Sequence, residues 1–267
     1  MLKDADPTFS PAGDPSLRHE IATACRIAAF RGLCEDVLGH ISSRHPGGLL
    51  MRCRRPQERG LLFTTADDIL LTGPDGALLE PADGAAVPNE IHIHTEILRA
   101  RPDVDVVLHA HPPAIVALDM VGLSLVPVVG AYNIPAARMA RDGIPTYPRS
   151  VLVNTPALGR ELVAALGEKD VCVMRGHGLV TTGRTVKEAL SRALSLDALA
   201  RVMLLAAGAG QVPAGLPDAD LAQLPDLGAG FNDEQNWRFQ VSALALAGLA
   251  IPERGSSPAT SCCSTPC

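Results

Sequence analysis

Histidines occur in three patterns along the chain that could serve a metal ion. His92 and His94 form one His-x-His pair, and His109 and His111 form a second pair 17 residues further on. The third pattern is the Gly-His-Gly around His177. Imidazole nitrogens are common ligands of zinc and other transition metals, so each pattern is a candidate for a metal site. The alternative for any single histidine is an ordinary place on the surface or in the core.

The secondary structure expected around each pair decides between them. Side chains at positions i and i+2 point about 200° apart on a helix, whereas they share one face of a strand. Segment 90–101 has apolar residues at helical spacing, so the histidines of the first pair should diverge. Segment 103–111 is β-branched and apolar and ends before two prolines, which predicts a strand. We therefore expect the second pair to bind the metal, and the first pair to pack on the helix surface or in the core.

Two histidines do not complete a site, because a zinc-type centre takes three or four protein ligands. Glu90 begins the helix before the strand, and the fold can bring its carboxylate close to the end of that strand. The glycines on both sides of His177 allow a sharp turn and leave its imidazole accessible. The sequence therefore predicts a metal site formed by Glu90, His109, His111 and His177.

The elements that must position these residues follow from the apolar patterns. Helices are expected at 16–33, 90–101, 112–122, 134–144, 156–167, 185–209 and 232–250. Strands are expected within 39–53, 60–80, 103–111, 123–129, 150–155 and 170–183, with a tight turn at Asp75-Gly76. Interleaved strands and helices predict one α/β domain over residues 16–210. We expect a flexible arm at 1–15, a C-terminal helical extension at 211–252 and a disordered tail at 253–267.

The composition excludes several classes of function. A formal charge of −6 and the lack of a basic run argue against a nucleic-acid partner. No run of apolar residues reaches the length of a transmembrane helix, and the N-terminus lacks the apolar core of a secretory signal. Scattered cysteines suit a reducing compartment, so we expect a cytoplasmic protein.

The same motifs resemble those of the class II aldolase and adducin family, typified by fuculose-phosphate aldolase. The resemblance covers about residues 18–208 and rests on Glu90, the helix ending in RARPDV, the His-x-His-Pro element and the later Gly-His-Gly. It implies a single three-layer α/β/α domain with a central, largely antiparallel sheet, and a homotetramer with metal sites near subunit interfaces. It also implies one divalent metal ion, with Glu90 acting as both ligand and proton-transfer base. Histidine and carboxylate ligands suit Zn, Mn, Co and Fe(II) alike.

Departures from the family pattern bear on the substrate. Pro88 and Asn89 stand where the sugar-phosphate aldolases have two serines that help to hold phosphate, and Gly39-His40 replaces their Gly-Asn. These differences disfavour a phosphorylated sugar. They resemble the branch that acts on non-phosphorylated, often aromatic acids, including dihydroxyphthalate decarboxylases. His40 and Asn89 would then contact a small organic acid, although an ordinary loop histidine is the alternative for His40.

Two further residues are candidates with clear alternatives. Arg59 belongs to a group of four arginines between positions 52 and 59, which could clamp a carboxylate or form a solvated basic loop. Tyr132 lies near the place where family aldolases have an acid tyrosine that acts across a subunit interface. A packing role is the alternative for Tyr132.

Three functions remain open at this level. The first is a metal-dependent lyase that breaks a C–C bond of a hydroxy- or oxo-acid, by decarboxylation or retro-aldol cleavage. The second is a non-haem Fe(II) oxygenase that shortens a prenylated hydroxyphenylpyruvate or mandelate, like a family branch in aminocoumarin biosynthesis. The third is a metal-free interaction module like that of adducin. The sequence favours the lyase, because a scaffold has no need of four converging ligands.

Overall fold

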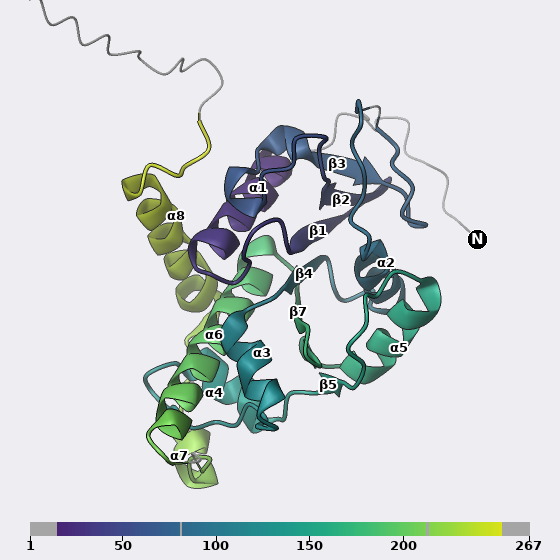
Figure 1. Ribbon diagram of the computed structural model, residues 1–267. Helices are drawn as coiled ribbons and strands as arrows, with labels where there is room; N and C mark the ends of the chain where they lie inside the picture. Colours follow the sequence, from purple (N-terminus) through teal and green to yellow (C-terminus); the bar gives the residue numbers. More distant parts are fainter. Residues whose placement is uncertain (1–14, 81, 212–213, 253–267) are drawn as a thin grey trace, which may run out of the picture.

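The computed structural model describes residues 15–80, 82–211 and 214–252. They form an α/β fold in which helices cover both faces of one sheet (Figure 1). The flexible arm predicted for residues 1–15 falls almost wholly outside the described residues, and the tail predicted for 253–267 falls entirely outside them.

The described residues contain one seven-stranded sheet, with strand order β3-β2-β1-β4-β7-β6-β5. Only β5 and β6 pair in parallel, so the prediction of a largely antiparallel sheet is confirmed. The central strand is β4, which is paired on both sides. The strands are β1 (His40–His45), β2 (Gly48–Arg52), β3 (Ile69–Thr72), β4 (Val106–Ala110), β5 (Thr146–Tyr147), β6 (Val171–Met174) and β7 (Gly178–Gly183).

Apolar side chains on the two faces of the sheet pack under different helices, which gives the three layers expected. On β4, Val107 belongs to the core under α2 and α5, and its neighbour Leu108 belongs to the core under α1 and α6. This division follows from the alternation of side chains along a strand. One layer contains α2 (Ile91–Ala100) and α5 (Pro156–Leu166); the other contains α1 (Pro15–Phe30), α3 (Pro113–Met120), α4 (Ile134–Arg141) and α6 (Val186–Gly208).

The C-terminal part of the described chain adds two helices, α7 (Asp218–Gln223) and α8 (Asn236–Leu246), and a π-helical turn before α8. The helix α8 packs against α1, where Leu244 is buried in the shared core and the Arg31 guanidinium donates to the Gln240 side chain at 2.8 Å. The boundary between a domain at 16–210 and an extension at 211–252 remains a prediction. Among the described helices, none is long and apolar enough to cross a membrane.

Two strands expected from apolar runs are wrong. Segments 123–129 and 150–155 have no strand partner and form irregular chain. Leu125 and Val153 are nevertheless buried, which explains why both runs are apolar. Pro127 also removes a backbone donor from the first run, which disfavours a ladder there.

The stretch before β3 also differs from the expected strand. Residues 61–63 and 66–68 form two 3-10 turns, η1 (Leu61–Phe63) and η2 (Ala66–Asp68), and only Ile69–Thr72 is strand. The expected turn at Asp75-Gly76 is present, with Gly76 at a φ of 87°, a conformation that favours glycine.

Candidate metal centre

Four side chains converge at the end of β4. The nearest ligand atoms of Glu90, His109, His111 and His177 all lie within 4.8 Å of one another. Glu90 Oε2 lies 3.5 Å from the Nε2 atoms of both His109 and His177. Two ligands of a tetrahedral zinc ion lie about 3.3–3.4 Å apart when each bond is about 2.0–2.1 Å long. The cluster therefore has nearly the spacing that one divalent ion requires.

Strand register brings the first two histidines together. His109 on β4 pairs with His40 on β1 and with Val180 on β7, so its side chain lies near the middle of the sheet. His111 follows two residues later, and its Nε2 lies 2.8 Å from His109 Nε2. His109 Nδ1 lies 3.0 Å from the Leu179 carbonyl oxygen, so this nitrogen carries the proton and donates it. The Nε2 lone pair of His109 is thereby left for a metal ion, as is usual for histidine ligands.

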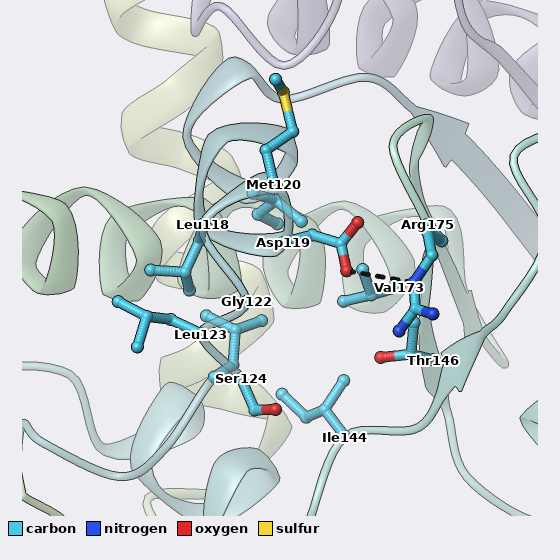
Figure 2. A pocket seen from close by; sticks show the side chains of 12 residues that line it. Leu118, Asp119, Met120, Gly122, Leu123, Ser124, Ile144, Thr146, Val173 and Arg175 are labelled. Atoms are coloured by element: carbon cyan, nitrogen blue, oxygen red, sulfur yellow. Dashed lines mark ion pairs between the residues drawn. The ribbon is translucent and has the colours of Figure 1, made fainter.

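The third histidine lies on a turn that is tied to helix α3. His177 follows Gly176, whose φ of 56° favours glycine. The Gly176 backbone N–H donates to Asp119 Oδ2 at 2.7 Å, and Arg175 Nε lies 3.8 Å from Asp119 Oδ1. Figure 2 shows this ion pair beside a cavity of about 230 Å³ between α3 and the β5–β6 edge. Asp119 thus fixes the turn that presents His177.

Glu90 occupies the N-cap position of α2 and is 5% exposed. Its Oε1 accepts a hydrogen bond from the Val153 backbone N–H at 3.0 Å, so the irregular segment 150–155 orients this carboxylate. Burial alone would raise the pKa of Glu90, but the neighbouring imidazoles of His109 and His177 outweigh it and lower the pKa well below its usual range. The carboxylate is therefore ionised and its Oε2 faces the cluster.

The surroundings of His111 suit a neutral metal ligand. Burial, followed by repulsion from His109 and His177, lowers the pKa of His111 to about 3. Imidazole binds metals in its neutral form, so three imidazoles and one carboxylate would together carry a single negative charge, which a divalent cation offsets. This donor set and its spacing fit a transition-metal ion.

A buried row of polar side chains adjoins the cluster. His40 Nε2 lies 4.0 Å from Glu90 Oε2, and His40 Nδ1 lies 2.7 Å from His94 Nε2. On the far side, His94 Nδ1 lies 2.7 Å from Ser42 Oγ. We expected only a packing role for His94 and did not identify its contact with His40. The available signal was its position four residues after Glu90, which places both on one side of the helix.

Three other candidates lie outside the four-ligand cluster. Asn89 is exposed beside Glu90. Arg59 lines a cavity of about 310 Å³ and lies 5.2 Å from the ring centre of Phe63. Tyr132 is 74% exposed and borders a cavity of about 500 Å³ beside α6. No residue of the four-ligand cluster lines either cavity. Within one chain, these two cavities therefore do not connect Arg59 or Tyr132 with the cluster.

Known proteins with similar sequences include two bacterial decarboxylases. The chain is 47% identical to a 3,4-dihydroxyphthalate decarboxylase of Arthrobacter keyseri over 90% of this chain and 98% of that protein. It is 50% identical to a 3,4-dihydroxyphthalate decarboxylase of Terrabacter sp. (strain DBF63) over 85% of this chain and 96% of that protein.

The fold has a counterpart among solved structures. The crystal structure of an aldolase II superfamily protein from Pseudomonas syringae superposes with a TM-score of 0.76 at 24% identity, covering 91% of this chain and 96% of that one. The sequence model of a protein family, the class II aldolase and adducin N-terminal domain, matches residues 19–204, which include all four residues of the cluster. The chain therefore belongs to the class II aldolase and adducin family.

Proposed function

We propose that this protein is a divalent-metal-dependent decarboxylase whose substrate is 3,4-dihydroxyphthalate. The observation that carries the proposal is the convergence of Glu90, His109, His111 and His177 in a chain about half identical to decarboxylases of that acid. The relatives reported above give no support to the oxygenase. A metal-free adducin-like module does not account for four ligand atoms at this spacing.

The substrate has a carboxylate at C2, next to the hydroxyl at C3. When the bond between C2 and this carboxylate breaks, its electron pair stays on the ring, CO2 leaves and a proton takes its place at C2. The product is 3,4-dihydroxybenzoate. A bound divalent ion would polarise the neighbouring substrate oxygen and stabilise the negative charge that develops.

Residues of the chain would carry out the proton transfer and bind the substrate. Glu90 Oε2 would take the hydroxyl proton and return it to the ring carbon, while the Val153 N–H holds Oε1 in place. His40, 4.0 Å from Glu90 Oε2, is placed to contact a substrate carboxylate at the edge of the cluster. We retain Asn89, which neighbours Glu90, as a second polar contact. For Arg59, a role in substrate binding stays a prediction.

We further propose that the protein is a homo-oligomer, a tetramer as the family resemblance implies, in which Tyr132 acts on the site of a neighbouring subunit. The 74% exposure of Tyr132 leaves its side chain free for such a contact. A cytoplasmic location is supported by four buried cysteines in the described chain, none of which forms a disulfide.

The metal is tested by elemental analysis of protein purified without oxygen from a metal-replete host. Zinc, manganese or cobalt near one equivalent per chain would agree with a lyase. Iron would require measuring O2 uptake with arylpyruvates before the decarboxylase is accepted.

The reaction is tested by incubating the metal-loaded protein with 3,4-dihydroxyphthalate and measuring CO2 and 3,4-dihydroxybenzoate. We expect both products in equal amounts, and none from the His109→Gln variant. L-fuculose 1-phosphate serves as the comparison substrate. Cleavage of the sugar phosphate without CO2 release from the phthalate would reject the proposed function.

A further inference from the structure

Ser42, His94 and His40 form an unbroken hydrogen-bonded row between β1 and α2 that ends at the candidate metal centre. Both links measure 2.7 Å, and the ring centres of His40 and His94 lie 4.8 Å apart. Ser42 and His94 are fully buried, and His40 is 5% exposed. None of these three residues belongs to the four-ligand cluster, so the metal site alone does not explain them.

The hydrogen bonds along this row can run in only two directions. Both rings are buried among hydrogen-bond partners, where an added positive charge is costly. Both rings are therefore neutral, and each carries one N–H. In the first arrangement Ser42 donates to His94, His94 donates to His40, and His40 keeps its proton on Nε2. In the second arrangement every donation runs the opposite way, and His40 Nε2 is a bare lone pair.

The two ends of the row select the first arrangement. In the second one the Ser42 hydroxyl would need another acceptor, and no other hydrogen bond of Ser42 Oγ occurs within the described residues. A buried hydroxyl without an acceptor is costly. At the other end, a bare His40 Nε2 would face the ionised Glu90 carboxylate 4.0 Å away, whereas an Nε2–H is attracted to it.

We propose that Ser42 and His94 are positioning residues that hold His40 with its proton on Nε2, ready to donate to the carboxylate of the substrate that is not lost. The identity of that carboxylate, at C1 of 3,4-dihydroxyphthalate, rests on the proposed function. The tautomer does not, because it follows from the contacts of the protein alone. Supporting residues behind a metal site typically change affinity or activity about 10- to 100-fold when removed.

The tautomer is measured directly by solid-state 15N NMR of metal-free protein in which only histidine is labelled. The signals of His40 are assigned by their loss in the His40→Gln variant. We expect the His40 Nε2 signal at the shift of a protonated nitrogen and Nδ1 at that of an unprotonated one. The reverse assignment, or a doubly protonated ring, would overturn the proposal.

Kinetics test the consequence with a matched pair of variants. Ser42→Ala removes the first donor of the row. Ser43→Ala removes a hydroxyl from the next position of β1, which lines a different cavity beside Leu17 and Val186. We expect Ser42→Ala to raise KM for 3,4-dihydroxyphthalate about 10- to 100-fold with a smaller change in kcat, and Ser43→Ala to match the wild type.

A truncated ligand identifies the group that His40 contacts. The probe 2,3-dihydroxybenzoate lacks the carboxylate in question, so Ser42→Ala should leave its inhibition constant unchanged. An equal loss of affinity for both ligands, or an unchanged KM in Ser42→Ala, would contradict the proposed contact. If the wild type fails to decarboxylate the phthalate, the proposed function is wrong, and the NMR measurement still decides the tautomer. The same measurement decides it if Ser42→Ala does not fold.

Discussion

Gly178→Ala should damage the proposed metal site without replacing any of its proposed ligands. Gly178 follows His177 directly and begins β7, and a Cβ built there would lie 2.2 Å from the Ala110 carbonyl oxygen and 3.1 Å from His111 Cα. Carbon and oxygen atoms approach to about 3.3 Å at best, so the backbones must separate by about 1 Å. The shift would move His177 away from His111. A misplacement of about 1 Å costs about 100-fold in rate, and overpacking costs about 1–3 kcal/mol of stability.

The assay compares kcat/KM for decarboxylation, bound metal per chain and the urea midpoint of unfolding. Gly208→Ala is the control, because a Cβ at Gly208 in α6 would meet no atom within 4 Å. That variant should keep full activity and gain about 0.4–1 kcal/mol in the free energy of unfolding. Wild-type activity and metal content in Gly178→Ala would refute the reasoning, since the turn would then relax without moving His177.

The remaining predictions concern metal binding and stability. His109→Gln should abolish stoichiometric metal binding in elemental analysis, and His92→Gln should leave metal binding unchanged. Metal retained in His109→Gln would exclude His109 as a ligand. A chelator should remove the activity, and added metal should restore it. Thr185→Ala removes the side-chain acceptor at the N-cap of α6 and should lower the free energy of unfolding by about 1 kcal/mol, measured by urea titration; no change would show that this helix end is capped otherwise. Leu162 is fully buried and Leu246 is 92% exposed. In the same assay Leu162→Ala should lower the free energy of unfolding by about 2–5 kcal/mol, and Leu246→Ala by less than about 0.5 kcal/mol. Equal losses of stability would contradict the burial described for these two leucines.

Local patterns were sufficient to predict the elements that position the site. The β-branched, apolar run in 103–111 predicted β4, and the strand's two-residue period predicted that His109 and His111 share a face; their Nε2 atoms are 2.8 Å apart. The helical spacing in 90–101 predicted α2 and the divergence of the first His-x-His pair. The motifs also predicted the grouping of Glu90 with the three histidines, whereas the family resemblance supplied the antiparallel sheet.

Several supporting contacts between distant segments were not predicted. The bond between Gly176 and Asp119 spans 57 positions, and the one between Ser42 and His94 spans 52. No periodicity in the sequence reports such pairs. The wrong strand at 150–155 has a related cause, because an apolar run reports burial and not the partner of its backbone. The Val153 N–H bonds the Glu90 side chain, where a strand would have offered it to a neighbouring backbone.

The proposed ligands lie on elements of unequal stability, and this difference would affect how fast a bound ion exchanges. The strand that carries His109 is paired on both sides, and residues in such central strands exchange their amide protons only in the rarest openings. His177 instead follows Arg175 and Gly176, which are both exposed on the turn before β7. Local opening of this turn should be far more frequent than unfolding of the sheet. A bound ion would therefore enter and leave past His177, and its exchange rate would follow the opening of that turn rather than the stability of the fold.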